Sequence, residues 1–235
     1  FLPNSDSQVL GHSADGARVL DASGGHVKSR PLDLDSARQA RTSPDKRFVA
    51  MSGPRTQLWD SSMSKLLFET DESDYVVFSQ DGTRMVLLDY RSGCNLRVFD
   101  TKTFEETWGL SLSDNAWLTT FEISPNGQFI GSWSNIGLSY QFQLWDLATQ
   151  KSKLLLAPED LSDPRETIFS PDGQLVAPMW LSSDLRSVTV KLIEVATGRD
   201  RGSISHTDSS CLKPVFHNDN QLFVSVKDDN FITGW

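Results

Sequence analysis

The sequence predicts an all-β protein, a β-propeller of six four-stranded antiparallel blades, and a repeated turn is the main observation behind this prediction. A Ser-x-Asp-Gly corner, clearest as FSPDGQLV at residues 169–176, returns in weaker copies along the whole chain. The copies begin 30 to 47 residues apart, at Ser13, Ser43, Ser79, Ser124, Ser170 and His217. A period of about 40 residues is typical of architectures in which each unit buries its apolar face only by stacking on its neighbours.

Short runs of alternating apolar residues, as at 83–88 and 95–99, fill each repeat and are bounded by Gly, Asp, Asn and Ser. This alternation is typical of β-strands. Asp-Gly or Asn-Gly at 81–82, 126–127 and 172–173 supplies the positive φ that tight hairpins need. Each of these dipeptides therefore predicts a corner between the first and second strands of a unit.

The third strand of each unit ends on an acidic residue that starts another turn. These endings are QLWD at 57–60, RVFD at 97–100, QLWD at 143–146 and KLIE at 191–194. A fourth strand, such as 65–68 or 152–156, then leads to the next corner. Four short strands per period, with no helical stretch, are typical of propeller blades.

The corner followed by Leu-Trp-Asp resembles the WD40 repeat, and the resemblance covers nearly the whole chain. It is strongest in the last unit, where the family's buried His, Ser, Asp and Trp correspond to His206, Ser225, Asp229 and Trp235. The resemblance implies that these four form a hydrogen-bonded tetrad, which satisfies polar groups that are costly to bury alone. Elsewhere the pattern is degenerate, because only Trp59 and Trp145 keep the Trp-Asp pair.

Length and composition favour a single propeller domain over residues 1–235. The chain is 38% hydrophobic, enough for a core, but six repeats leave no room for a second substantial domain. Only ten positions separate Asp33 from Ser43, so a fourth strand hardly fits in the first unit. Because the last unit has no fourth strand after Trp235, we expect either that residues 1–7 complete it by ring closure or that a longer polypeptide carries a seven-bladed or larger propeller. A monomeric domain is expected in both cases.

Charge and motif content argue against several classes of function. The net charge of −9 and the absence of a basic run argue against nucleic-acid binding. No apolar run approaches the roughly 18 residues that cross a bilayer, and two cysteines are too few for a disulfide framework. Acidic clusters at 71–74, 159–163 and 228–229 lack the ligand spacing of a calcium loop and are interpreted as solvated loop charges. No catalytic, metal or cofactor site is predicted.

Aromatic and arginine residues in the loops are the candidate binding residues, because these types dominate interaction hot spots. The predicted partner-binding residues are Tyr90, Arg91, Trp117, Tyr140, Arg165 and Arg186. Trp133 and Trp180 occupy nearly equivalent places in their repeats, and either packing between blades or exposure in a loop fits that position. The expected binding face is the one that carries the loops between second and third strands and between successive blades.

The sequence favours a non-enzymatic scaffold that presents this loop face. The WD40 resemblance implies a protein or peptide partner and a cytoplasmic or nuclear setting. One alternative is a periplasmic or enzyme-associated propeller, because Asp100-Thr101 and VATG at 195–198 resemble the turns of that class. A second alternative is a propeller that binds glycans through exposed tryptophans.

Overall fold

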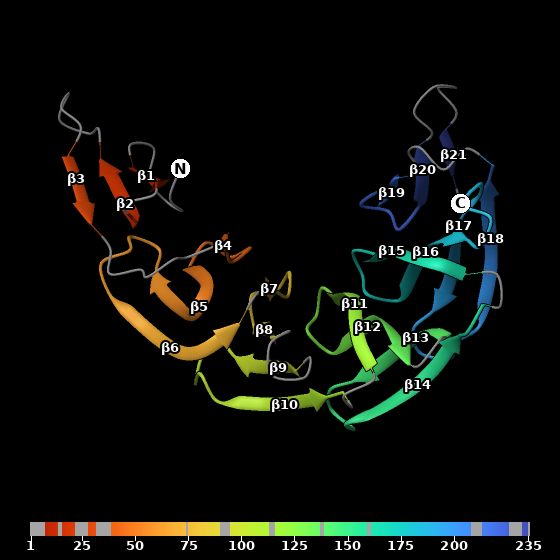
Figure 1. Cartoon of the computed structure of the whole chain (residues 1–235), viewed down its shortest axis with the longest axis horizontal. Coiled ribbons are helices and arrows are strands. Elements are labelled where there is room, and N and C mark those ends of the chain that lie inside the picture. Colours follow the sequence, from red (N-terminus) through yellow and green to blue (C-terminus); the bar gives the residue numbers. More distant parts are fainter. Residues whose placement is uncertain are drawn as a thin grey trace. The chain divides into compact units, whose positions relative to one another are not determined.

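All regular structure that the computed structural model describes is β-strand, and the strands form antiparallel sheets in sequence order (Figure 1). The structure describes residues 8–13, 16–21, 28–31, 39–73, 75–89, 95–112, 116–136, 139–158, 161–207, 213–225 and 232–234. Within these residues there is no helix long and apolar enough to cross a membrane. The chain divides into two compact units, residues 1–111 and 112–235, and each is described by itself.

The first unit contains three sheets. The first sheet consists of β1 (Gln8–Ser13), β2 (Gly16–Asp21) and β3 (Lys28–Pro31). The second sheet consists of β4 (Gln39–Thr42), β5 (Phe48–Asp60) and β6 (Leu66–Ser73). The third sheet consists of β7 (Tyr75–Phe78), β8 (Arg84–Asp89), β9 (Asn95–Asp100) and β10 (Glu106–Ser111).

The second unit also contains three sheets. The fourth sheet consists of β11 (Ala116–Ile123), β12 (Phe129–Ile136), β13 (Ser139–Asp146) and β14 (Lys151–Leu156). The fifth sheet consists of β15 (Leu161–Phe169), β16 (Leu175–Ser182), β17 (Val188–Glu194) and β18 (Asp200–His206). The sixth sheet consists of β19 (Lys213–Phe216), β20 (Leu222–Ser225) and β21 (Ile232–Gly234).

The all-β fold of successive antiparallel sheets confirms the predicted propeller class, whereas the number of strands per sheet varies. The third, fourth and fifth sheets have four strands, and the first and sixth have three in the described part of the chain. Residues 1–7 and Trp235, on which the ring-closure prediction depends, lie outside the described residues.

The second sheet departs from the prediction of four strands. β5 is one strand of 13 residues, which pairs with β4 through residues 49–52 and with β6 through residues 53–59. Only 17 positions separate Ser43 from Asp60, against 21 to 24 between the corresponding residues of the next three units. The missing positions are those of the middle hairpin, so the second and third expected strands merge.

The predicted corners share one hydrogen-bonding arrangement. In the third sheet the Ser79 hydroxyl donates to Asp81 Oδ1 at 2.6 Å, and the backbone N–H of Arg84 donates to Ser79 Oγ at 3.0 Å. The same arrangement is found at the corners that begin with Ser43, Ser124 and Ser170. His217 replaces the serine in the sixth sheet, where its Nδ1 lies 2.9 Å from Asp219 Oδ1, so His217 is a turn residue.

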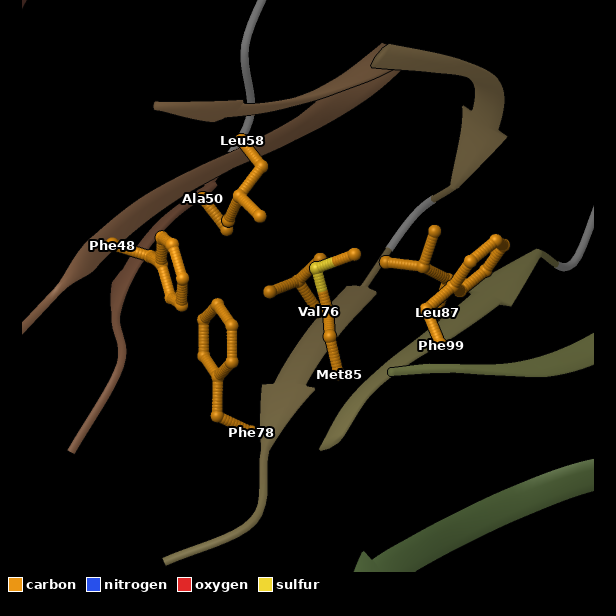
Figure 2. Close-up of a cluster of buried hydrophobic side chains, with 8 residues drawn as sticks. All are labelled: Phe48, Ala50, Leu58, Val76, Phe78, Met85, Leu87 and Phe99. Carbon is orange, nitrogen blue, oxygen red and sulfur yellow. The ribbon is translucent and has the colours of Figure 1, made fainter. Parts of the chain in front are cut away.

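Apolar side chains fill the space between successive sheets. Between the second and third sheets, Figure 2 shows Phe48 facing Phe78, with Val76 and Met85 beside them and Leu87 next to Phe99. Comparable clusters join the fourth sheet to the fifth and the fifth to the sixth. Full burial of such a side chain contributes about 1.5–3 kcal/mol. These clusters pack the second sheet against the third, the fourth against the fifth and the fifth against the sixth, and the ends of their strands are left free to vary in sequence.

Candidate functional site

Four of the six predicted partner-binding residues lie in the described part of the chain, and all four belong to the second unit. They are Trp117 on β11, Tyr140 on β13, Arg165 on β15 and Arg186 between β16 and β17. They come from the fourth and fifth sheets, which contact each other through β11 and β15. Tyr90 and Arg91 lie outside the described residues.

Trp117 begins a row of three paired residues across the fourth sheet. Trp117 pairs with Asn135 on β12, and Asn135 pairs with Tyr140 on β13. The side chain of Trp117 is 53% exposed, and Ile136, at the same end of the sheet, is 43% exposed. Tyr140 is partly buried and packs against the core between the fourth and fifth sheets. The row therefore combines an exposed indole with a tyrosine held by the core.

Arg165 adds an exposed cation on the neighbouring sheet. Its Nε lies 3.2 Å from Asp163 Oδ2, and both side chains are about half exposed. Exposed pairs of this kind contribute little to stability. The guanidinium can therefore exchange Asp163 for a partner's acceptor at small cost.

Arg186, which the sequence places in a loop between the second and third strands, lies in a tight corner. The Ser182 hydroxyl donates to Asp184 Oδ1 at 2.5 Å, and the backbone N–H of Ser187 donates to Ser182 Oγ at 3.0 Å. Hydrogen bonds from Ser182 and from the Arg186 backbone lower the pKa of Asp184, although slight desolvation opposes them. The middle hairpin of the fifth sheet thus uses the same corner as its first hairpin.

Trp133 and Trp180 pack between sheets. Trp133 is 0% exposed and Trp180 is 6% exposed, and their rings meet edge-on with centroids 5.9 Å apart. Trp133 also contacts Phe142, with the ring centroids 5.3 Å apart. Of the two interpretations open from the sequence, packing between blades is the one that the structure shows. Neither indole can contact a partner directly.

The contact between the fourth and fifth sheets also buries polar atoms that find no hydrogen-bond partner among the described residues. These atoms are the indole nitrogens of Trp133 and Trp180, Asn135 Oδ1 and Thr167 Oγ1. An unsatisfied buried polar group costs about 1–3 kcal/mol. Aromatic packing therefore has to offset this cost where the fourth and fifth sheets meet.

The tetrad predicted in the last unit stays a prediction. His206 ends β18 and is partly buried, Ser225 ends β20, and Asp229 and Trp235 lie outside the described residues. A related contact occurs in the fourth sheet, where Trp145 Nε1 donates to Ser132 Oγ at 2.9 Å. This pair was not predicted from the sequence, although the Trp-Asp ending at Trp145 was its signal.

A concave site that the sequence does not predict lies at the corner end of the fourth and fifth sheets, the end that carries the corners at 124–129 and 170–175. It is a pocket of about 700 Å³, lined by both corners and by the turn after β17. Within the described ranges, no group of three His, Cys, Asp or Glu residues could hold a metal ion. The arrangement therefore offers two surfaces for binding, one at each end of these sheets.

The sequence matches no protein-family model and no curated protein. Solved structures of β-propeller proteins are similar to it. Kuenenia stuttgartiensis hydrazine synthase has a TM-score of 0.60 at 20% identity, over 88% of this chain and 60% of that chain. TolB from Acinetobacter baumannii has a TM-score of 0.55 at 18% identity, over 97% of this chain and 59% of that chain.

A third similar structure is the dihydro-heme d1 dehydrogenase NirN in complex with DHE. Its TM-score is 0.60 at 18% identity, over 95% of this chain and 50% of that chain. The chain thus spans 50 to 60% of the length of these three structures. At such identities the likeness shows the β-propeller fold, and the narrower WD40 resemblance stays a prediction.

Proposed function

We propose that the chain is a binding propeller of the enzyme-associated or periplasmic kind, which presents the Trp117 end of the fourth and fifth sheets to a protein or peptide partner and performs no reaction itself. The proposed class is the periplasmic or enzyme-associated alternative that the sequence left open, and the proposed binding residues are those predicted from the sequence. The half-exposed indole of Trp117, held on a rigid sheet, is the observation that carries the proposal.

The similar structures support the choice of class. Two of the three are named for enzymes, a hydrazine synthase and a dehydrogenase, and this chain spans 60% and 50% of their lengths. A propeller of this length is therefore compatible with a place inside a larger enzyme or beside one. The proposal sets aside the cytoplasmic or nuclear setting, which depended on the WD40 resemblance.

The chemistry of the Trp117 end supports a protein or peptide partner. Trp and Arg are the residue types most enriched among binding hot spots, and a rigid scaffold lowers the entropic cost of presenting them. Trp117 and Ile136 offer apolar area, and Arg165 offers a cation whose present ion pair is weak. Together they can bury an apolar side chain and bind an acidic group of the partner.

The test begins with a partner captured by cross-linking in the source cell, whose affinity is then measured for wild type and three variants. Trp117→Ala should weaken binding about thirtyfold, the equivalent of about 2 kcal/mol for a hot spot. Arg165→Ala should weaken it several-fold, with a steeper effect at low salt.

Leu154→Ala is the matched control, because Leu154 is 52% exposed on β14 of the same sheet. It should bind as wild type does. Equal affinities of the Trp117 and Leu154 variants would place the binding surface elsewhere.

A further inference from the structure

The pocket at the corner end is separate from the Trp117 end. Its walls include Asn126, Gln128 and Phe129 from the fourth sheet, and Gln174, Glu194 and Arg201 from the fifth. Trp117 lies near the start of β11, and the corner that lines the pocket follows the end of that strand. Six residue steps of a strand span about 20 Å. A ligand in this pocket would therefore not touch the surface proposed for a protein partner.

The walls carry side-chain amides with unused hydrogen-bonding capacity. In the part of the chain that the structure describes, the amide groups of Gln128 and Gln174 and the Nδ2 of Asn126 make no hydrogen bond. Asn126 Oδ1 accepts the Ser124 hydroxyl at 2.7 Å, which fixes the orientation of the Asn126 amide. A carboxamide both donates and accepts. Three of them around one pocket match a ligand that carries several hydroxyl groups.

An incompletely covered aromatic ring forms an apolar part of the wall. Phe129 follows Gln128, and its ring is partly exposed and lines the pocket. At the equivalent corner of the second sheet, the guanidinium of Arg47 lies 4.7 Å above the ring of Phe48, which is only 7% exposed. Gln128, the equivalent residue, is shorter than arginine and uncharged, so no guanidinium covers the ring of Phe129. The C–H face of a sugar ring can pack against such an aromatic surface.

The charged groups of the pocket already have partners. Glu194 is ion-paired with Arg201 and accepts the Thr197 hydroxyl at 2.7 Å. Asp172 accepts hydrogen bonds from Ser170 and from Asn220 of the sixth sheet. Two carboxylates against one guanidinium leave a negative balance, which disfavours phosphates and other anions.

From these observations we propose that the pocket binds a neutral oligosaccharide, held by Asn126, Gln128 and Gln174 and packed against Phe129. Small-ligand pockets are typically about 300–1,000 Å³, and this one, at about 700 Å³, accommodates a disaccharide. The proposal does not depend on the protein-binding function, because it uses none of the residues at the Trp117 end.

The experiment is an NMR titration of the ¹⁵N-labelled whole chain with maltose, cellobiose and diacetylchitobiose. At least one sugar should shift the side-chain NH₂ signals of Gln128, Gln174 and Asn126, with a Kd of about 1 mM. Gln128→Arg, which copies Arg47 and fills the pocket, should weaken that binding at least tenfold without lowering the melting temperature. Trp117→Ala should leave it unchanged.

Three results would overturn the proposal. The first is no shift with any sugar at about 20 mM, which is about twentyfold above the expected Kd. The second is sugar binding that Trp117→Ala abolishes and Gln128→Arg does not, which would place the glycan on the exposed tryptophan. The third is a shift of the same NH₂ signals by trilysine and by none of the sugars, which would make the pocket a site for basic peptides.

Discussion

The first corners of the second and third sheets meet at one seam, and those of the fourth and fifth sheets meet at another. These two corner seams use the same turn and differ in the side chains that fill them. Between the second and third sheets, Arg47 Nη2 donates to the carbonyl oxygen of Gly82 at 3.2 Å, and Arg47 also pairs with Asp45. Between the fourth and fifth sheets, Gln128 occupies the position of Arg47 and makes no such contact among the described residues. The serine-based turn thus fixes the backbone in both seams. The residue four positions after the serine, Arg47 or Gln128, then decides whether the space between the two corners is closed or open.

The largest difference between the seams should appear when alanine replaces their glycines. Gly82 has φ +70°, and an added Cβ would lie 2.7 Å from Asp45 Cγ, which hydrogen bonds hold in place. Gly173 has φ +71°, but the nearest atom to its added Cβ would be Asn126 Nδ2, at 3.4 Å, which is an ordinary van der Waals contact. Left-handed backbone costs about 1–2 kcal/mol and overpacking about 1–3 kcal/mol more. Urea unfolding should therefore show a loss of about 3 kcal/mol for Gly82→Ala and about 1 kcal/mol for Gly173→Ala.

The double variant Asp45→Ala, Gly82→Ala is the control for this comparison. It should recover part of the cost, because the residues in contact are coupled. Equal losses for the two glycine variants would show that the closed seam is no tighter than the open one.

A smaller effect is expected from exchanging the residues that close or open the seams. Arg47→Gln removes the hydrogen bond to Gly82 and the cation–π contact with Phe48, and should cost about 1–2 kcal/mol. Gln128→Arg should cost nothing measurable or raise stability slightly. Differential scanning calorimetry of both variants measures this, and a wild-type melting temperature for Arg47→Gln would contradict the interpretation of Arg47 as the group that closes its seam.

The smallest effect concerns acid. Burial raises the pKa of Asp45, but hydrogen bonds from Ser43 and Arg47 and the charge of Arg47 outweigh it, so the pKa lies below its usual value. Burial and the bonds from Ser79 and Thr83 act in the same way on the pKa of Asp81. The resulting stabilisation is present above the unfolded value of about 3.9 and is lost as pH falls through the lower folded value. Asn126, which stands at the same position of the fourth-sheet corner, does not titrate.

Hydrogen exchange at pH 5 and pH 3, corrected for intrinsic rates, measures this difference. The protection of the Arg47 and Thr83 amides should fall at pH 3, while that of the Gln128 amide should change less. An equal loss of protection at all three amides would mean that acid acts on the whole fold rather than on the acidic corners.

The corners and the propeller class could be predicted because their signal is local. A Ser and an Asp or Asn two positions later supply all the side-chain hydrogen bonds that the turn needs. The corner at residues 182–187 has the same Ser and Asp, Ser182 and Asp184, but it was not predicted because it lacks the glycine of the Asp-Gly pattern. Leu185 takes the positive φ of 57° there instead. The merging of strands in β5 was visible only as a short spacing, which propensity does not measure.

The candidate site was less predictable, because it depends on which face of a sheet each residue reaches. Trp133 and Trp117 both lie in the fourth sheet, but the first is buried and the second is half exposed. A bulge between Leu118 and Thr120 shifts the pairing of β11 with β12, and the residue types at these positions do not predict it. The pocket could not be predicted from the sequence either, because it exists only where the Gln128 side chain does not reach across the seam.

The serine-centred corner also has a consequence for how the chain folds. Each corner closes with bonds between residues at most five positions apart, so its hairpin can begin to form before any other sheet exists. Hairpins of this size form in about 1–10 μs, whereas contacts between distant parts of a chain form more slowly. We therefore expect the hairpins to be early, independent nuclei and the docking of one sheet on the next to limit the rate. Folding can then start at several places along the repeat array at once.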